Sequence, residues 1–448
     1  MDAGKLKSEI ISTAKLAWPV SLGQLGHIML GVVDSMMVGR VGVDALAAAS
    51  LVNGLFFLII VIGFGMSMAT TPLVSFHLGR KNYKKCAGVL NQSLILNSVF
   101  AILLTVIVYS ASYLIRYFNQ PEMVVKYAQS YMQILSYSIF PFLIFQVYKQ
   151  FAEGIKQTKL PMYIAIVANI VNFFGNWILI YGKLGLPALG LDGAGYSTLL
   201  TRVFMGIAMI ILVYRSKSTE IFNLNFNLGR IDFSIIRKLL RIGFPSGFIY
   251  TLEIGVFTFA AVMVGWIGSN ELAAHQIAIN LASISYMIIL GVSAAGTIRV
   301  GYALGKNDKA GIKSAGYSAV LLGMIFMLIS ATVFVIFNTL LPSLYISDKE
   351  VIDISSYLLI IAALFQISDG IQAISIGILR GIMDVKIPMY FTIIAYWLIA
   401  APTSYVLGFK FHFGIYGIWA GLLIGLSIAA VLLIRRFENK TKVNTSQI

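Results

Sequence analysis

The stretch LVNGLFFLIIVIGFGMSM, residues 51–68, contains no charged side chain. Comparable uncharged runs occur at 94–111, 319–337 and 422–434. About 20 apolar residues in a helix cross the hydrocarbon core of a bilayer, where backbone polar groups must be satisfied within the segment itself. These runs therefore predict an integral membrane protein built from helices.

Composition agrees with this expectation, because 58% of the 448 residues are hydrophobic and 11% are charged. A soluble domain carries about 25% charged residues. Hydropathy along the whole chain predicts twelve spans, at approximately 16–38, 46–77, 89–112, 127–148, 160–182, 194–214, 243–266, 272–298, 314–341, 351–378, 387–408 and 414–434.

The net charge of +15 is distributed unevenly between the predicted loops. If the N-terminus is cytoplasmic, the inside segments hold 26 of the 33 Lys and Arg residues, and Arg202 lies within a span. The outside loops hold the remaining six, at Arg40, Arg116, Lys126, Lys183, Lys349 and Lys410. This asymmetry follows the positive-inside rule. It predicts two cytoplasmic termini and basic residues that face membrane lipid, not a nucleic-acid-binding protein.

The chain also contains an internal repeat. Three pairs of matching elements are separated by a nearly constant offset in residue number: MVGRVGVDALAA (37–48) with MVGWIGSNELAA (263–274), Pro19 with Pro245, and GIKQTKLPMY (154–163) with GIMDVKIPMY (381–390). The offset is 226 for the first two pairs and 227 for the third. Shared hydrophobicity alone does not maintain such an offset. The sequence therefore predicts two homologous halves.

Each half contains six predicted spans, an even number, so the halves are expected to be parallel and related by an axis along the membrane normal. The expected fold class is all-α integral membrane, with twelve transmembrane helices in two six-helix lobes related by a pseudo-two-fold axis. The predicted parts are an N-lobe (1–215), a cytoplasmic linker (216–241), a C-lobe (242–434) and a cytoplasmic tail (435–448). Two lobes of this kind are typical of an alternating-access carrier.

Several other classes of protein are disfavoured. The segment LGKND (304–308) lacks the spacing and the Ser/Thr of a phosphate-binding loop. The four histidines lack metal-ligand spacing, no nucleophile–base pair can be argued, and the single cysteine, Cys86, cannot form a disulfide within the chain. No removable signal is expected before the first span. The sequence therefore predicts neither an enzyme nor a cofactor. It predicts transport that is either coupled to an ion or powered by another subunit.

Three acids, Asp34, Glu253 and Asp369, lie within predicted spans, whereas the other fifteen lie in loops or at span ends. A charge at the middle of a bilayer costs about 2.5–3.5 kcal/mol on the insertion scale, so such residues persist mainly where ions, water or partners reach them. No lysine is predicted within a span, and Arg202 is the one arginine there. Hydrogen bonding between helices is the alternative role for each acid.

The fifth span carries Asn169, Asn172 and Asn176, whose spacings of three and four place them on one helix face. Carboxylate and amide oxygens suit a hard cation. If this face meets Asp34, then Asn172, Asn176 and Thr198 could complete a Na⁺ site. The same amides could instead hold a protonated Asp34, or could simply join two helices.

The repeat indicates that the acids are not duplicated. At an offset of 226, Asp34 falls opposite Ala260 and Glu253 falls opposite His27, whereas at 227 Asp369 falls opposite Phe142. The two halves therefore carry different titratable groups on a common scaffold. Glu253 and Asp369 belong to the same half and could share one proton or ion.

Together these features resemble the multidrug and toxic compound extrusion (MATE) family, and its NorM-type bacterial branch in particular. The resemblance covers essentially the whole chain and rests on the doubled MVG…LAA and LG(R/K)N elements and on three acidic segments: VVDSMMVGR (32–40), LEIGVFTFA (252–260) and ISDGIQAISIGILRG (367–381).

The resemblance implies that Asp34, Asn172 and Asn176 are the cation and proton positions of the N-lobe, and that Glu253 and Asp369 form the C-lobe site. Phe365 stands where some relatives carry a tyrosine, which removes one possible oxygen ligand.

For the whole protein, the resemblance implies a monomer in the inner or plasma membrane that exports small organic cations, such as drugs and dyes, in exchange for Na⁺ or H⁺. A flippase for a lipid-linked precursor or a polysaccharide unit is the alternative function. Twelve spans and an acidic interior favour a cationic cargo.

Overall fold

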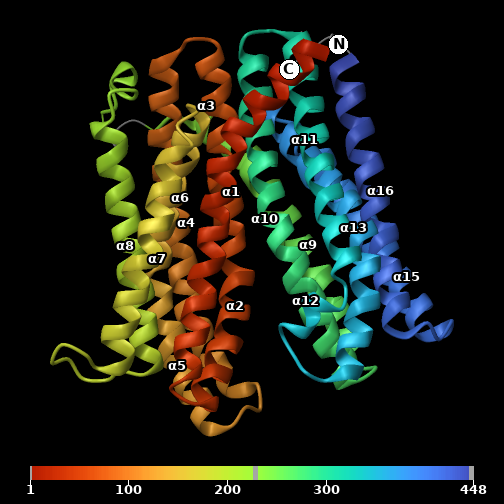
Figure 1. Ribbon diagram of the computed structural model, residues 1–448. Coiled ribbons are helices and arrows are strands. Elements are labelled where there is room, and N and C mark those ends of the chain that lie inside the picture. Colours follow the sequence, from red (N-terminus) through yellow and green to blue (C-terminus); the bar gives the residue numbers. More distant parts are fainter. Residues whose placement is uncertain (1–2, 226–230, 443–448) are drawn as a thin grey trace. The chain divides into compact units, whose positions relative to one another are not determined.

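The computed structural model describes residues 3–225 and 231–442, and every regular element within these ranges is helical (Figure 1). Parts of the predicted linker (216–241) and of the predicted tail (435–448) lie outside the described residues.

The first half of the chain forms eight α-helices and two short 3-10 helices. The α-helices are α1 (Ala3–Gly39), α2 (Val43–Ser67), α3 (Thr70–Gly79), α4 (Tyr83–Ser112), α5 (Glu122–Tyr137), α6 (Ile139–Gly154), α7 (Lys159–Tyr181) and α8 (Leu191–Arg215), and the 3-10 helices are η1 (Tyr113–Tyr117) and η2 (Glu220–Phe222).

The second half repeats this order of long helices with more irregularity near its end. Its elements are α9 (Phe233–Gly265), α10 (Ser269–Gly305), α11 (Lys309–Ile336), α12 (Leu340–Ser343), α13 (Lys349–Gly381), α14 (Lys386–Thr392), the π-helix η3 (Ile393–Ala400), α15 (Ala401–Tyr405), the π-helix η4 (Val406–Lys410) and α16 (Gly414–Lys442).

Within the described ranges, eleven helices are long and apolar enough to cross a membrane, and the bent pair α5–α6 makes a twelfth. This confirms the expected twelve-helix membrane fold. The fourth predicted span (127–148) is not one straight helix, because α5 and α6 meet at an angle of 42°. Pro141 lies in the first turn of α6 and has no N–H to bond to the preceding turn, so the helix breaks beside Ser138.

Close packing divides the chain into two compact units. The N-unit is Leu22–Gly247, and the C-unit combines Met1–Ser21 with Phe248–Ile448. The boundaries lie inside α1 and α9, directly after Ser21 and Gly247, which are equivalent positions of the sequence repeat. Each of these two helices therefore contributes its first part to one unit and its second part to the other. The lobe limits drawn from the sequence remain a prediction.

In the N-unit, the first part of α9 packs against the end of α2 through glycines. A Cβ atom on Gly243 would lie 2.9 Å from the backbone of Met66, and one on Gly247 would lie 3.0 Å from the Ile62 carbonyl oxygen. Small residues allow transmembrane helices to approach at backbone distance. The glycines therefore set the separation of α9 and α2.

In the C-unit, the first part of α1 packs against α10 at the repeat-equivalent positions. The Ser21 hydroxyl donates a hydrogen bond of 2.9 Å to the Ile288 carbonyl oxygen, and a Cβ atom on Gly291 would lie 2.8 Å from the Ala17 carbonyl oxygen. Ser21 and Ala17 are the repeat equivalents of Gly247 and Gly243. The repeat thus extends to the contacts of the first helix of each half.

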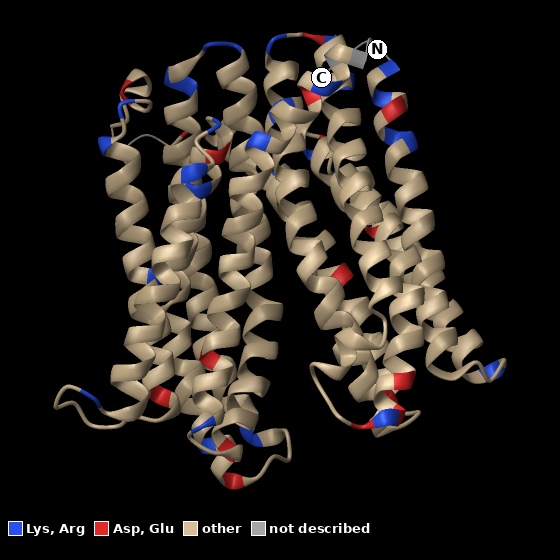
Figure 2. Ribbon diagram, viewed as in Figure 1, with Lys and Arg blue, Asp and Glu red and all other residues tan. Residues whose placement is uncertain are grey.

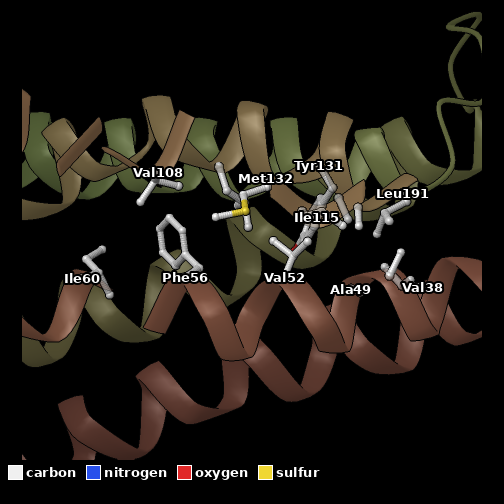
Figure 3. Close-up of a cluster of buried hydrophobic side chains, with 14 of the residues drawn as sticks. Val38, Ala49, Val52, Phe56, Ile60, Val108, Ile115, Tyr131, Met132 and Leu191 are labelled. Carbon is white, nitrogen blue, oxygen red and sulfur yellow. The ribbon is translucent and has the colours of Figure 1, made fainter. Parts of the chain in front are cut away.

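A buried apolar cluster holds the second part of α1 beside α2, α4, α5 and α8 in the N-unit (Figure 3). Val52, Phe56 and Ile60 follow each other at intervals of four on α2 and face Val108 and Met132. Such spacing places all three on one helix face. The cluster fixes the turn of α1 that carries Asp34.

Charged residues in both units lie mostly near helix ends, and few occur along the middle of the helices (Figure 2). This distribution agrees with helices that cross a hydrocarbon layer, where charge is costly. The few charged side chains away from the ends are therefore the first candidates for function.

Candidate functional site

The Asp34 carboxylate accepts hydrogen bonds from two other helices of the N-unit. The Asn176 amide nitrogen on α7 donates to Asp34 Oδ1 at 2.6 Å, and the Thr198 hydroxyl on α8 donates to Oδ2 at 3.1 Å. Asn176 also donates to Asn172 Oδ1 at 3.3 Å. Asn172 and Asn176 are buried. The structure therefore brings together the four residues predicted for this site.

Close packing of α7 on α8 explains why these residues meet. A Cβ atom on Gly175 would lie 2.5 Å from the Ser197 hydroxyl, so the two helices touch beside the site. The same hydroxyl donates to the Asn172 carbonyl oxygen at 3.1 Å. Because Thr198 follows Ser197 on α8, this contact also sets the position of its hydroxyl.

Asn169 lies on the same helix but serves a different purpose. Its amide donates to the carbonyl oxygens of Gly26 on α1 at 2.9 Å and of Ala165 at 2.8 Å. The face of α7 that carries three asparagines is therefore divided: Asn172 and Asn176 approach Asp34, and Asn169 joins α7 to α1. Asn169 and Asn176 are seven positions apart, which is almost two helical turns, so both amides cannot reach the Asp34 carboxylate.

Arg202, on α8, places a positive charge near this site. Its guanidinium donates to the Ser138 hydroxyl at 2.6 Å and lies over the rings of Phe56 and Phe142, with 5.1 and 4.9 Å to their centroids. It lies within electrostatic range of Asp34. Because the Arg202 guanidinium is bound to the α5–α6 junction and to two rings, it acts on the Asp34 carboxylate from a distance. The carboxylate oxygens bond instead to Asn176 and Thr198.

The Asp34 site offers two carboxylate oxygens, a hydroxyl and amide oxygens, of which Asn176 Oδ1 is buried and has no hydrogen-bond partner. Such a set suits a hard monovalent cation or a proton. No group of three or more His, Cys, Asp and Glu side chains that could hold a metal ion occurs within residues 3–225 and 231–442.

The C-unit contains the second pair of predicted acids. Glu253 on α9 and Asp369 on α13 are 6% and 5% exposed, and they lie within electrostatic range of each other. The Tyr286 hydroxyl on α10 donates to Glu253 Oε1 at 2.8 Å. The two acids thus lie in one buried region, where like charges favour the uptake of a proton or cation.

Three uncharged polar residues around these acids were not predicted. Gln366, Gln372 and Tyr396 are all buried, and the side-chain polar atoms of Gln366 and the Tyr396 hydroxyl have no hydrogen-bond partner. The Gln372 amide lies beside Glu253 without a well-formed hydrogen bond. Gln366, Asp369 and Gln372 follow each other at intervals of three, and this pattern could have predicted that the two glutamines lie near the acid.

Tyr396 lies in η3, whose irregular backbone precedes Pro402. A proline cannot donate to the carbonyl one turn earlier, so regular α-helical bonding is interrupted there. Phe365, by contrast, packs among rings, with centroids 6.0 Å from Phe257 and 5.9 Å from Trp419. It contributes to the wall of the region and not to its polar groups.

The prediction that no lysine lies within a span is wrong, because the bent pair α5–α6 includes Lys149. Lys149 and Glu153 are 3% and 2% exposed and belong to α6, which continues to Gly154. The sequence prediction ended the fourth span at residue 148 because charged residues follow it. Their spacing of four, which pairs side chains on a helix, was the signal that could have retained them.

Comparison with known proteins adds a family match. The MatE family model matches residues 19–178 and 245–406, and the two matched stretches begin at the repeat-equivalent prolines Pro19 and Pro245. The chain is 34% identical over 444 residues to the "Probable multidrug resistance protein NorM" of Mesorhizobium japonicum, covering 98% of this chain and 95% of that protein. It is 31% identical to the "Multidrug resistance protein MdtK" of Yersinia pseudotuberculosis, covering 98% and 97% of the two chains.

Solved structures agree with the helical arrangement. The structure titled "Crystal structure of MATE in the bent conformation" superposes with a TM-score of 0.89 at 20% identity, covering 98% of this chain and 97% of the other. The eukaryotic MATE transporter AtDTX14 superposes with a TM-score of 0.86 at 21% identity, covering 98% of each chain. At these identities the likeness concerns the fold alone.

Proposed function

Since the chain belongs to the MatE family, we propose that this multi-pass membrane protein exports cationic or amphipathic organic compounds in exchange for Na⁺ or H⁺ by alternating access. Relatives that match almost its whole length are named multidrug resistance proteins. Members of this family are transporters and not enzymes. The observation that carries the proposal is Asp34, a carboxylate inside a helical bundle whose hydrogen bonds come from Asn176 and Thr198.

Asp34 is proposed as the group that alternates between ion-bound and ion-free states. Its present partners donate N–H and O–H to it, as suits an ionised carboxylate. An amide has both donors and an acceptor, so rotation of the Asn176 side chain would present its oxygen to a cation. A proton on Asp34 would remove the charge instead. Either event changes the interactions among α1, α7 and α8, which links ion binding to helix position.

Glu253 and Asp369 are proposed as a second ion-coupling site. Exchange of a monovalent cationic drug for one Na⁺ or H⁺ moves no net charge across the membrane. Moving one charge through 100 mV is worth about 2.3 kcal/mol, so a second ion would allow the membrane potential to drive export. The buried acid pair of the C-unit offers a place for that ion.

The test is ethidium efflux from proteoliposomes with imposed ion gradients. We expect concentrative ethidium efflux when the gradient of the coupling ion, Na⁺ or H⁺, drives that ion in the direction opposite to the dye. Without an ion gradient we expect no concentrative efflux. Equal rates with and without every gradient would contradict the antiport proposal. Comparing the two gradients at fixed membrane potential identifies the coupling ion.

The proposed location is the inner or plasma membrane, in which the protein acts as a monomer with both termini in the cytoplasm. The uneven distribution of Lys and Arg among the loops supports this orientation. Single cysteines introduced at Ser218 and Ser347 should react with an impermeant reagent from opposite sides, the former from the cytoplasm. Labelling of both from the same side would contradict the orientation.

A further inference from the structure

Arg202 is a positive charge beside the Asp34 site that the proposed ion exchange does not use. It lies near the middle of α8, four positions after Thr198, so the two side chains occupy one helix face, one turn apart. Thr198 donates to Asp34 Oδ2 at 3.1 Å. The guanidinium is therefore one helical turn away from a direct contact of the carboxylate. A charge inside a span is costly and persists mainly where it has a role.

Three contacts hold the Arg202 guanidinium beside the carboxylate and not on it. Its Nη1 atom donates to Ser138 Oγ at 2.6 Å, and its Cζ atom lies 5.1 and 4.9 Å from the ring centroids of Phe56 and Phe142. The Ser138 hydroxyl donates its own proton to the Leu135 carbonyl oxygen at 2.6 Å, so its oxygen accepts from the arginine. The cation is thus fixed near the acid without occupying the carboxylate oxygens.

The titratable groups that face Asp34 come from α8 and α5. Arg202 acts on Asp34 and Asp34 acts on Arg202, so the two charges lie within electrostatic range of each other. Tyr131 on α5 is 2% exposed and lies within range of both. The groups that α7 contributes, Asn172 and Asn176, are uncharged amides. An ion that arrives at Asp34 therefore meets the positive charge of Arg202.

The acid and the cation occur together in one half of the protein, and both are replaced in the other. At an offset of 226, Asp34 falls opposite Ala260 and Arg202 falls opposite Ile428, and at 227 Arg202 falls opposite Ala429. All three replacements are apolar. The repeated scaffold therefore does not require an arginine at this place, which favours a joint role of Asp34 and Arg202 over a requirement of helix packing.

The acids of the C-unit have different surroundings. Glu253 and Asp369 act on each other, and Tyr286 and Gln372 lie beside Glu253. None of these neighbours is a cation. An ion that approaches the C-unit acids is attracted by two carboxylates, whereas an ion at Asp34 is attracted by one carboxylate and repelled by Arg202.

We propose that Arg202 is a positioning residue of the Asp34 site that weakens ion binding there, so that the carboxylate releases its ion in each transport cycle. The inference rests on the proposed role of Asp34. Na⁺, H⁺ and a cationic compound each bring one positive charge, so the repulsion applies to all three. An opposite charge close to a carboxylate typically lowers its affinity for a proton about tenfold or more. Lower affinity appears mainly as faster dissociation.

The first experiment isolates the N-unit site by working in the Glu253→Gln/Asp369→Asn background. Binding of ²²Na⁺ at constant pH and uptake of protons, followed with a pH-sensitive dye, are measured on the purified protein. Arg202→Met should bind the ion at Asp34 about tenfold more tightly, because methionine can still pack on the rings but carries no charge. Arg202→Gln, which can still donate to Ser138, should show the same change.

The second experiment measures ethidium efflux from proteoliposomes with the C-unit acids intact. In Arg202→Met and Arg202→Gln the half-saturating concentration of the driving ion should fall about tenfold. The maximal rate of efflux should fall as well, because ion release becomes slower. A merely structural defect would lower the maximal rate without lowering the half-saturating concentration.

Three control variants separate the charge from its contacts. Arg202→Lys keeps the positive charge, and Ser138→Ala removes the hydrogen bond but keeps the arginine. Lys149→Met removes another buried cation of the N-unit, which acts on His27 and Glu153. All three should leave the half-saturating ion concentration close to that of the wild type.

Unchanged ion affinity in both Arg202→Met and Arg202→Gln, at wild-type melting temperatures, would overturn the inference. Equal tightening in Lys149→Met would do the same, because the effect would then not depend on where the charge lies. If neither Arg202 variant folds, Arg202 is a structural residue and the inference is wrong.

Asp34→Asn, measured in parallel, distinguishes this inference from the proposed function. In the background that lacks the C-unit acids it should abolish ion binding, and alone it should abolish efflux. If Asp34→Asn exports ethidium normally, the proposed role of Asp34 fails. If Asp34→Asn is inactive while the Arg202 variants bind the ion as the wild type does, only the role of Arg202 fails.

Discussion

The same position in the two halves of this protein holds different chemistry. In the N-unit, His27 lies edge-to-face against Phe142. At the repeat-equivalent positions of the C-unit, Glu253 lies within electrostatic range of Asp369. In both units, therefore, the first helix of the half meets the helix that ends where the repeated element GIKQTKLPMY or GIMDVKIPMY begins, α6 in the N-unit and α13 in the C-unit. The fold preserves the meeting point, and the side chains decide whether it holds an aromatic contact or a pair of acids.

Two turns further along α1, the N-unit carries an acid and the equivalent position of the C-unit does not. Asp34 binds Asn176 and Thr198, whereas Ala260, its repeat equivalent on α9, is fully buried and apolar. The two halves thus place their acids at different depths along the equivalent helix.

The largest effect is expected from Asp34→Asn, which removes the charge and keeps the shape. The variant should fold and insert, yet ethidium efflux should fall about a hundredfold or more, since the exchanging group has gone. Growth in ethidium and efflux from vesicles, at matched expression, measure this. Wild-type resistance would remove Asp34 from the mechanism.

An intermediate effect is expected from Glu253→Gln and Asp369→Asn. Both variants should keep measurable drug binding but lose most of the dependence of efflux on membrane potential, because they remove the site proposed for the second ion. Efflux under a valinomycin-clamped potential at constant Na⁺ and pH tests this. If both respond to potential as steeply as the wild type, the C-unit acids are not a coupling site.

A smaller effect, on stability alone, is expected from Gly247→Val at the contact of α9 with α2. The added side chain would meet the backbone of Ile62, from which even a Cβ atom would be 3.0 Å away. Overpacking of this kind costs about 1–3 kcal/mol. A lower melting temperature in detergent is the expected result, and an unchanged one would mean that α9 has room to shift.

The smallest effect is expected at the matching contact in the C-unit. Ser21→Ala removes the hydrogen bond to the Ile288 carbonyl oxygen without adding volume. Interhelical hydrogen bonds in membrane proteins average about 0.6 kcal/mol. The melting temperature should therefore fall less than in Gly247→Val, and a larger fall would show that Ser21 does more than join two helices.

The Asp34 site was largely accessible from the sequence. A carboxylate in one apolar run and asparagines at spacings of three and four in another are local patterns, and the structure brings Asp34, Asn172, Asn176 and Thr198 together. Their role in ion coupling remains a prediction. The different contacts of the three asparagines on α7 could not be predicted from the sequence, because the bond from Asn169 to Gly26 depends on how α7 lies against α1.

Other polar groups escaped prediction for identifiable reasons. Lys149 and Glu153 follow the apolar run, so hydropathy alone assigns them to a loop although α6 buries them. Tyr396 and Gln366 carry no charge, and tyrosine and glutamine are unremarkable in a membrane helix. What distinguishes them is burial without a hydrogen-bond partner, which is a property of the packed structure.

The sequence by itself determined the class of protein, its helical spans and its duplication. These properties are encoded in the order of residues: uncharged runs long enough to cross a bilayer must be helical, and a constant offset is visible without coordinates. Tertiary structure alone decided which polar groups meet and that α1 and α9 each divide between two packed units. Such contacts join residues up to hundreds of positions apart, and they depend on how closely small residues allow helices to approach, which no local pattern specifies.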